Sequence, residues 1–346
     1  MRPPEIVEGA DLAPLSTFRL PARAGQLVVL DDIEQLPLLP PDDGPRLVLG
    51  GGSNTLFLAD WPGQVLLNRL GGIQTQALED GRVRVRAAAG ESWHGLVRWC
   101  LDRGLYGIEN LVLIPGSVGA APMQNIGAYG VELADVLESV TVWDWSRRAG
   151  AEIPAAECGL AYRDSRFKSA DRGRFLITAV SLRLRRDFRP ALGYQSLADA
   201  LAKRRLTPPQ PRQLAAAIMR LRRRRLPDPA RLANAGSFFK NPVVSPARAE
   251  QVLADHPDLP CWRLPDGRFK LAAGWMIEQL GWRGRRIGDA GVHEHHALVL
   301  VNHGRASAAQ LLELMDSIRE AVDSAFGVRL EPEPQLVGWN PDQKRG

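Results

Sequence analysis

Short apolar runs separated by glycine-rich turns dominate the first half of the chain. Leu47–Leu49 leads directly into the sequence GGGSN, and Val83–Arg86 alternates apolar and basic residues. Alternation with period two is typical of a β-strand with one buried face. Residues 139–143 and 175–184 have the same character, and the longer run alternates again. The pattern predicts a strand-rich N-terminal part.

Helical spacing is found in three places. It covers residues 93–102 and again residues 213–225, where the sequence LPDP ends the helix. Near the C-terminus, Ser307–Gln310 forms a capping box ahead of an apolar stripe over residues 311–322, which Gly327 closes. Residues 187–212 contain several prolines and few strand signals, so they predict a linker. Together the elements predict an α+β fold with a C-terminal lobe.

The composition agrees with a folded protein of two or three domains. The chain has 346 residues, of which 45% are hydrophobic, so sizeable cores can form. Cys100, Cys158 and Cys261 lie far apart without a CxxC pair, which argues against a disulfide framework and a cysteine zinc site. The first residues, MRPPEIVEGADLAPL, lack an apolar signal core, and no run has the length of a membrane span. We therefore expect a cytoplasmic protein that does not bind membranes.

The net charge of +5 reflects 44 basic and 39 acidic residues, and much of the excess lies in the run Arg220–Arg225. Such a run can bind nucleic acid or form a solvated helix face. No interleaved aromatic residue or nucleic-acid motif accompanies it. The solvated face is therefore favoured, and no nucleic-acid partner is expected.

Two loops of small residues are candidate ligand sites. Gly50–Asn54 follows a strand and can be a plain turn or a nest of N–H groups for a phosphate. It lacks the dinucleotide pattern GxGxxG, because Thr55 stands where the third glycine belongs. The second loop, Ile114–Gly130, contains four glycines and three alanines, which let a backbone approach a flat ligand closely. The amides of Gln124 and Asn125 can bond a heteroaromatic ring.

The hexamer GSFFKN, Gly236–Asn241, places a single hydroxyl between a glycine and two phenylalanines, followed by a cation and an amide. This mixture suggests a polar group held at the edge of an apolar pocket, facing a ligand. A strand end whose Ser237 hydroxyl bonds to the backbone is the alternative.

The sequence resembles one known family over nearly its whole length. The motifs LGGGSN, IPGSVGAAPMQNIGAYG, CGLAYRDSRFK, NAGSFFKNP, KLAAGWMIE and LEPE occur in this order. Together they closely resemble UDP-N-acetylenolpyruvoylglucosamine reductase, the flavoenzyme family of peptidoglycan precursor synthesis. Several long motifs agree in order and spacing, so the match is specific.

The resemblance implies a FAD-binding domain of the vanillyl-alcohol-oxidase (PCMH) type in two subdomains, followed by an α+β substrate-binding domain. With the pattern of elements, it predicts boundaries at residues 1–70, 71–212 and 213–338. It implies that NADPH reduces FAD and that the flavin reduces UDP-N-acetylglucosamine enolpyruvate to UDP-N-acetylmuramate. Neither loop contains cysteine and no histidine precedes His94, so FAD is expected to bind non-covalently.

The resemblance also implies the residues of the site. Those expected to bind the cofactor are Gly50, Gly51, Gly52, Ser53, Asn54, Pro115, Gly116, Ser117, Gly119, Ala120, Gln124, Asn125, Gly127 and Ala128. Those expected to contact the substrate are Tyr129, Tyr162, Tyr194, Arg225, Asn241 and His296. Arg225 stands where lysine is more familiar, and His296 stands where some relatives carry glutamine. Tyr194 belongs to a loop thought to close over the substrate diphosphate.

Three residues match the catalytic positions of the family. Ser237 occupies the position of the proton donor, and Arg163 corresponds to the arginine that binds the substrate carboxylate and stabilises an enolate. Glu333 corresponds to the catalytic glutamate, although Pro334 follows it where valine is familiar. Glu331 is the alternative carboxylate.

Two other interpretations are open at this point. The run His293–His296 invites a metal site, but its spacing is not HExxH and the family uses no metal, so none is expected. An oxidase with the same cofactor fold is a second flavoenzyme candidate, against which GSFFKN and LEPE argue. A bound flavin would separate both flavoenzymes from a basic nucleic-acid-binding protein.

Overall fold

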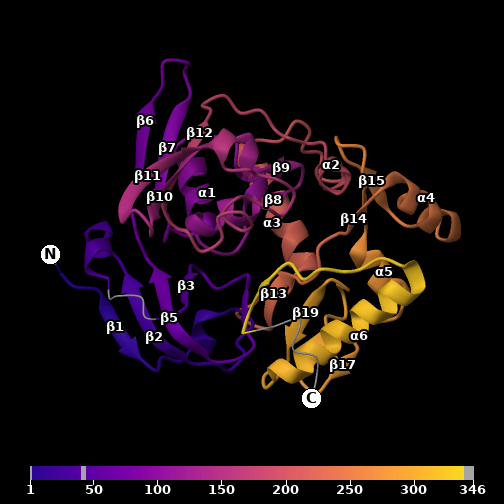
Figure 1. The fold of residues 1–346 in the computed structure, drawn as a ribbon. Helices are drawn as coiled ribbons and strands as arrows, with labels where there is room; N and C mark the ends of the chain where they lie inside the picture. The colour runs from indigo at the N-terminus through magenta and orange to yellow at the C-terminus, as the bar shows by residue number, and fades with distance from the viewer. Residues whose placement is uncertain (1, 40–43, 339–346) are drawn as a thin grey trace. The chain divides into compact units, whose positions relative to one another are not determined.

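The structure, a computed structural model, describes residues 2–39 and 44–338 (Figure 1). The described residues form two compact units. Of the described residues, unit 1 comprises 2–10, 24–39, 44–51 and 62–224, and unit 2 comprises 11–23, 52–61 and 225–338. Unit 2 therefore includes two segments from the N-terminal part of the chain, which the sequence pattern did not indicate. The three-domain division at 1–70, 71–212 and 213–338 stays a prediction.

Unit 1 contains two larger sheets, of four and five strands. In spatial order, the first consists of β1 (Glu5–Glu8), β2 (Ala24–Leu30), β5 (Trp61–Asn68) and β3 (Arg46–Leu49). The second consists of β11 (Ala149–Pro154), β10 (Leu137–Asp144), β12 (Phe175–Leu184), β7 (Val83–Ala88) and β6 (Ile73–Ala77), all paired antiparallel. All four strands predicted from the pattern are confirmed.

β12 differs from the alternating strand that was expected, because eight of its ten residues are buried. Its place in the middle of the five-stranded sheet explains the difference. Val180 and Leu182 belong to the core around α1, whereas Leu176 packs with Leu30 and Leu66 of the first sheet. A strand covered on both faces has no solvent side on which polar residues could alternate.

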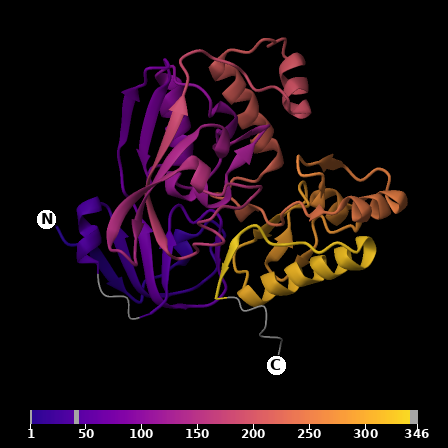
Figure 2. The same cartoon turned by 45° about the horizontal axis from the view of Figure 1, so that its top comes forward.

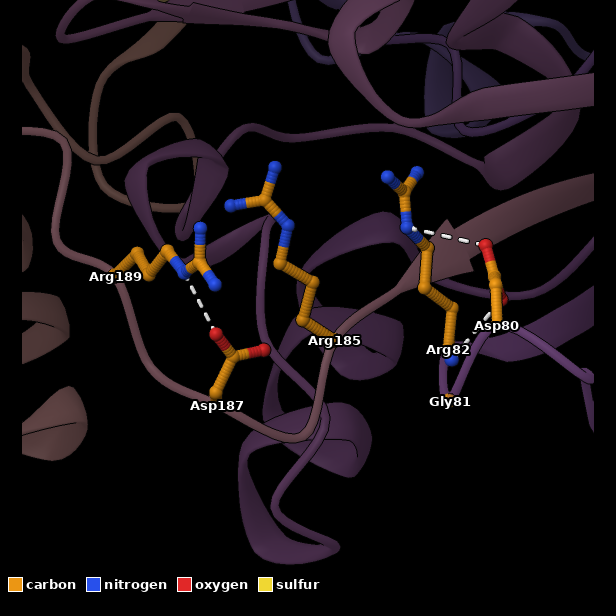
Figure 3. Close-up of a pocket in the computed structure, with 6 residues that line it drawn as sticks. All are labelled: Asp80, Gly81, Arg82, Arg185, Asp187 and Arg189. Carbon is orange, nitrogen blue, oxygen red and sulfur yellow. Dashed lines mark hydrogen bonds and ion pairs between the residues drawn. The ribbon is translucent and has the colours of Figure 1, made fainter.

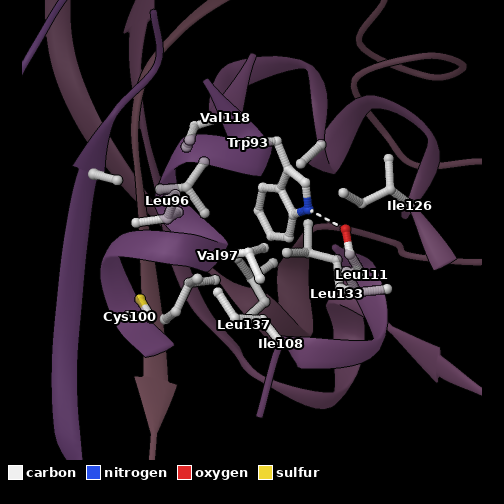
Figure 4. Close-up of a cluster of buried hydrophobic side chains, with 14 of the residues drawn as sticks. Trp93, Leu96, Val97, Cys100, Ile108, Leu111, Val118, Ile126, Leu133 and Leu137 are labelled. Carbon is white, nitrogen blue, oxygen red and sulfur yellow. Dashed lines mark hydrogen bonds between the residues drawn. The ribbon is translucent and has the colours of Figure 1, made fainter. Parts of the chain in front are cut away.

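Helix α1 (Trp93–Asp102) forms the centre of the main core of unit 1 (Figure 4). The side chain of Ser92 accepts the N–H of Gly95 at 3.2 Å and starts the helix. Trp93, at the head of the buried stripe, donates its indole N–H to the carbonyl of Leu111 at 3.1 Å. Burial raises the pKa of the Cys100 thiol on the same stripe to about 12, so this cysteine is a packing group. The predicted helix is confirmed, and its core anchors the chain that leads into the second glycine loop.

The predicted linker contains a helix. Helix α2 (Gln195–Ala202) buries Leu197 and Leu201, which are four residues apart, and α3 (Pro211–Arg225) follows it. The apolar stripe of α2 is short and prolines flank it, so its periodicity was weak in the sequence. The second glycine loop ends in a small hairpin of β8 (Gly127–Ala128) and β9 (Val131–Glu132). Short 3₁₀ helices cover Ala13–Leu15, Ile33–Leu38, Glu109–Leu111, Val118–Ala120, Pro122–Gln124, Leu133–Asp135 and Ala155–Glu157.

Unit 2 combines three small sheets with three helices. The first sheet has the spatial order β13 (Ala233–Ser237), β19 (Val299–Asn302), β18 (Ala290–Val292) and β17 (Arg286–Ile287). The second has the order β14 (Val243–Val244), β16 (Phe269–Leu271) and β15 (Cys261–Arg263). In the third, β20 (Gln335–Val337) pairs in parallel with β4 (Thr55–Phe57). The helices are α4 (Pro246–Asp255), α5 (Ala273–Gln279) and α6 (Ala308–Phe326).

Helix α6, yellow in Figures 1 and 2, packs against the core of unit 2. Its start shows the predicted capping box between Ser307 and Gln310, and its end shows the predicted left-handed Gly327 with φ of 57°. Phe18 and Leu56, from the two early segments, are fully buried in the same core. The side chain of Asn302 also donates to the carbonyl of Phe18 at 3.0 Å. These early segments are thus structural parts of unit 2.

Candidate functional site

The first two glycines of GGGSN lie against the second glycine loop within unit 1. A Cβ atom on Gly50 would overlap the hydroxyl of Ser117, and one on Gly51 would lie 2.9 Å from the Cα of Gly116. Position 51 therefore requires glycine because the two backbones approach so closely, and at position 50 a Cβ atom would collide with the Ser117 side chain. Gly119 has a similar constraint, since an added Cβ would lie 2.6 Å from the Cβ of Ala89.

This pair of loops offers unused backbone donors. The N–H groups of Val118 and Gly119 bond to the carbonyls of Glu91 and Ala89 at 2.8 Å and hold the loop in place. Within the described part of the chain, the N–H groups of Gly116 and Ser117 donate to no protein acceptor. Successive free N–H groups in a loop of small residues suit the phosphates of a dinucleotide. Pro115, Ala120, Gln124, Gly127 and Ala128 follow along the same loop.

Asn125 changes the expected pattern of cofactor contacts. It is buried and has a φ of 44°, a conformation that asparagine tolerates better than most residues. Its side-chain Nδ2 donates to Glu132 at 2.8 Å, and its Oδ1 accepts the N–H of Ala134 at 3.0 Å. Both ends of the amide are thus bonded to the segment that follows the loop. These bonds hold the loop to the chain that follows it, and a contact of Asn125 with the cofactor stays a prediction.

Tyr162 and Arg163 lie on a tight turn that the protein holds firmly. Backbone hydrogen bonds of 3.1 and 3.2 Å join Ala161 and Asp164, and Lys168 donates to the carbonyl of Arg163 at 3.2 Å. The guanidinium of Arg163 lies 5.5 Å from the centre of the Tyr162 ring. Arg163 also has a φ of 56°, which is uncommon for a residue other than glycine. Backbone strain of this kind persists where the surroundings fix it, often at functional sites.

Arg222 interacts electrostatically with Arg163, and the prediction that it lies on a solvated helix face is wrong. It continues the buried stripe of α3, four residues beyond Ile218 and eight beyond Leu214. Its Nε is buried and has no hydrogen-bond partner among the residues that the structure describes. Burial lowers the pKa of Arg222, with the charge of Arg163 acting in the same direction and Tyr129 against it. Arginine remains charged under these conditions, so the two cations favour an anion between or beside them.

Tyr129 and Tyr194 form an aromatic pair in unit 1. Their ring centres lie 5.2 Å apart with an interplanar angle of 75°. Tyr194 directly precedes α2 and is 42% exposed, which is high for a tyrosine. The structure thus brings together two predicted substrate residues that are far apart in the sequence.

Ser237 lies at the end of β13, just after a β-bulge in unit 2. The register with β19 pairs Asn234 with Val301 and then Ser237 with Val299, so β13 carries one extra residue. Gly236, in the bulge, has a φ of 73°, and an added Cβ would meet nothing within 4 Å. Glycine is therefore required for the backbone conformation, and the bulge redirects the side chain that follows. Phe238 and Phe239 are each 1% exposed and anchor the segment in the core, as expected.

Glu333 and Asn54 lie beside this segment. The N–H of Glu333 donates to the carbonyl of Phe238 at 2.7 Å, and the side chain of Asn54 donates to the carbonyl of Glu333 at 3.3 Å. Pro334 precedes β20 and removes no hydrogen bond from the pairing of β20 with β4. The unfamiliar proline is thus compatible with the strand register. Glu331, by contrast, is exposed and pairs with Lys240 at 3.0 Å, which favours Glu333 as the carboxylate of the site.

The GGGSN sequence is divided between the units, because Gly52, Ser53 and Asn54 belong to unit 2. Gly52 has a φ of 59°, and a Cβ atom there would overlap the carbonyl of Leu15. Two reasons, conformation and space, therefore require glycine at this position.

Three predicted substrate residues of unit 2 have defined surroundings. The Nδ1 of His296 accepts the N–H of Leu298 at 3.3 Å, so a neutral imidazole carries its proton on Nε2. Burial lowers the pKa of His296, and the charge of Arg225 lowers it further. The Oδ1 of Asn241 accepts the N–H of Ala273 at 3.0 Å, which leaves its NH₂ group as a donor. Together these groups present neutral and cationic donors, as an anionic ligand requires.

A separate recess on unit 1 contains none of the predicted site residues (Figure 3). It is lined by Asp80, Gly81, Arg82, Arg185, Asp187 and Arg189. Asp187 pairs with Arg189 at 2.6 Å, and Asp80 accepts from Arg183 at 2.7 Å. Its carboxylates are balanced by arginines, so it is best described as a solvated network of ion pairs.

Among the described residues, no group of three or more His, Cys, Asp or Glu side chains is arranged so that it could hold a metal ion. No helix in the described part of the chain has the length and apolar character needed to cross a membrane.

Comparison with known proteins agrees with these features. The model of the UDP-N-acetylenolpyruvoylglucosamine reductase C-terminal domain matches residues 228–337, and that of a FAD binding domain matches residues 42–147. A UDP-N-acetylenolpyruvoylglucosamine reductase of Chromobacterium violaceum is 47% identical over 332 residues, which cover 94% of this chain and 97% of the relative. One of Azoarcus sp. is 46% identical over 345 residues, covering 97% and 99%.

The solved structure of UDP-N-acetylenolpyruvylglucosamine reductase from Thermus caldophilus is 26% identical, with a TM-score of 0.66, and the match covers 96% of this chain and 98% of that one. A FAD-binding domain followed by the C-terminal domain of the reductases confirms the predicted fold class. The chain belongs to the UDP-N-acetylenolpyruvoylglucosamine reductase family and is an FAD-dependent oxidoreductase.

Proposed function

We propose that Arg163, Ser237 and Glu333 catalyse the reduction that this family performs, and that Arg222 assists them. The reaction converts UDP-N-acetylglucosamine enolpyruvate to UDP-N-acetylmuramate in peptidoglycan synthesis, with FAD as cofactor and NADPH as hydride donor. The observation that carries the proposal is the β-bulge before Ser237. The bulge sets a hydroxyl at a strand end whose next residue is bonded to Glu333.

The residues of unit 1 fit a dinucleotide cofactor. The close approach of Gly50 and Gly51 to Gly116 and Ser117 provides a surface of small residues with free N–H donors. When bound, FAD supplies hydride transfer to the substrate. We assign the phosphates of FAD to these loops, together with the other predicted loop residues, and assign Asn125 a role only through its backbone and its hold on the loop.

The substrate imposes two demands on the protein side chains. As hydride reaches the terminal carbon of the enolpyruvyl group, the neighbouring carbon gains enolate character that spreads into the carboxylate. Arg163, with which Arg222 interacts electrostatically in unit 1, supplies positive charge for this oxyanion. Ser237 donates the proton to the carbon, and Glu333 orients the developing enol or relays protons.

The remaining assignments concern the nucleotide sugar. We assign contacts with it to Tyr129, Tyr162, Tyr194, Arg225, Asn241 and His296. We further propose that the two large sheets of unit 1 correspond to subdomains 1–70 and 71–212, and that residues 213–338 bind substrate. The reaction belongs in the cytoplasm, where its nucleotide substrates are made, without a nucleic-acid partner.

We expect FAD to be bound without a covalent link. Neither glycine loop contains a cysteine or histidine to which the flavin could be attached. Denaturing the purified yellow protein and removing the precipitate should therefore leave the flavin in the supernatant. A flavin that remains with the precipitated chain would contradict this expectation.

Replacing Arg225 with alanine should weaken binding of the diphosphate-containing substrate. A charged hydrogen bond contributes about 1.5–3 kcal/mol, and the exposure of Arg225 places it at the lower end of this range. The KM for substrate should rise roughly 10-fold, while the rate of flavin reduction by NADPH stays unchanged.

Arg224→Ala is the matched control, because Arg224 is the exposed neighbour on the same helix. Equal, small effects in both variants would mean that Arg225 belongs to the solvated face and not to the substrate site.

A further inference from the structure

A segment of unit 1 that we call the strap, residues 187–194, connects β12 to α2 without a regular ladder of backbone hydrogen bonds. It touches the body of the unit at separate points. The Phe188 ring lies 5.4 Å from that of Tyr106, and the Tyr194 ring lies 5.2 Å from that of Tyr129. Between these aromatic contacts, the carbonyl of Ala191 accepts a hydrogen bond from Asn110 at 3.0 Å.

Asn110 also holds Tyr129. Its side chain is buried, and the same Nδ2 donates to the carbonyl of Tyr129 at 2.8 Å. An amide NH₂ group has two hydrogens, so both are used, one for each segment. Tyr129 has a φ of 51°, a conformation that needs support from its surroundings in a residue other than glycine. One buried amide thus fixes the strained backbone of Tyr129 and the middle of the strap together.

One ring of the aromatic pair interacts with Arg222, a partly buried cation of unit 1. Tyr129 interacts electrostatically with Arg222, and Arg222 interacts with Arg163. Any movement of the strap that separates Tyr194 from Tyr129 therefore changes the wall of the proposed substrate site.

We propose that Asn110 is a positioning residue, which clasps the strap to Tyr129 so that Tyr129 and Tyr194 form one preorganised wall for the nucleotide-sugar substrate. The inference rests on the proposed function, and Asn110 itself need not touch the ligand. A preorganised wall binds more tightly because less ordering is left to occur on binding. Without the Asn110 side chain, the carbonyls of Tyr129 and Ala191 lose their donor. The substrate must then order the strap when it binds.

The test compares Asn110→Ala with Asn68→Ala in the FAD-loaded protein. Asn68 is a matched control because it is also buried in unit 1 and its Nδ2 donates to a backbone carbonyl, that of Ile177, at 2.9 Å. The Asn110 variant should raise the KM for UDP-N-acetylglucosamine enolpyruvate roughly 10–100-fold. Its rate of flavin reduction by NADPH should not change. The Asn68 variant should lower thermal stability to a similar degree without this rise in KM.

Amide hydrogen exchange provides a readout that does not depend on turnover. Without substrate, exchange in residues 187–194 should speed up in the Asn110 variant and stay as in the parent protein in the Asn68 variant. Asn110→Gln keeps the NH₂ group on a longer side chain and should give an intermediate KM, and it replaces the alanine variant if that does not fold.

An unchanged KM and unchanged strap exchange in the Asn110 variant would overturn the proposal. An equal rise in KM in both asparagine variants would also do so, since it would show a general loss of stability. Absence of turnover in the parent protein would instead refute the proposed function, and the exchange experiment would still decide whether Asn110 clasps the strap.

Discussion

Replacing Ser237 with alanine is expected to slow reoxidation of the flavin by the enolpyruvyl substrate roughly 10²–10⁴-fold. Reduction of the flavin by NADPH should keep its rate, because that half-reaction needs no proton from this hydroxyl. The two half-reactions can be measured separately by rapid mixing with the substrate or with NADPH. A steady-state rate alone would not distinguish lost chemistry from lost folding.

The structure makes this variant a clean test. Ser237 follows the bulge at Gly236, and the neighbouring Phe238 and Phe239 anchor the segment in the core of unit 2. Removal of one oxygen should leave this anchor intact. Ser237→Cys retains a protonated group in the same place and should restore part of the rate. Equal slowing of both half-reactions would show that Ser237 shapes the pocket, and no slowing would assign the proton to Glu333 or water.

Replacing Arg222 with methionine is expected to lower kcat/KM for the enolpyruvyl substrate about 10–100-fold, the range of one or more lost charged hydrogen bonds. The thermal stability of the substrate-free protein should stay the same or rise. A buried cation without a full set of partners carries a desolvation cost, and an apolar side chain of similar length removes that cost.

Arg223→Met is the control for this variant. Arg223 is the exposed neighbour on α3, so its replacement should change neither kinetics nor stability by much. A clear fall in melting temperature of the Arg222 variant without a change in kcat/KM would identify Arg222 as a structural residue. A variant that loses activity but gains thermal stability is typical of a site where stability is sacrificed for function.

Elements with a strong local signal could be predicted from the sequence. Helix α6 has an apolar stripe, a capping box at Ser307 and a left-handed Gly327, and all three operate within the helix itself. Three strands of the five-stranded sheet, β7, β10 and β12, were predicted from their apolar runs, whereas β6 and β11 were not. Helix α2 was missed because Leu197 and Leu201 are its only buried side chains, too few to set a period.

The site was harder to derive, because its geometry depends on contacts between distant segments. Arg222 follows Ile218 at helical spacing, and this spacing was the available signal that it is not solvated. The signal was overlooked because Arg222 lies within a run of arginines, which is typical of a solvated helix face. Asn125 shows the converse: its amide looked free for a ligand, but the partners Glu132 and Ala134 take both ends. The roles of Ser237 and Glu333 came from the family resemblance, and they stay predictions.

The pairing of β4 with β20 has a consequence for how the chain folds during synthesis. Residues 11–23 and 52–61 leave the ribosome early, but the core that buries Phe18 and Leu56 is completed by α6 and β20, which are made last. The apolar side chains of these early segments therefore stay exposed to solvent while most of the chain is translated. Unit 2 has a high contact order for this reason, and we expect its assembly to be slow compared with the folding of local elements.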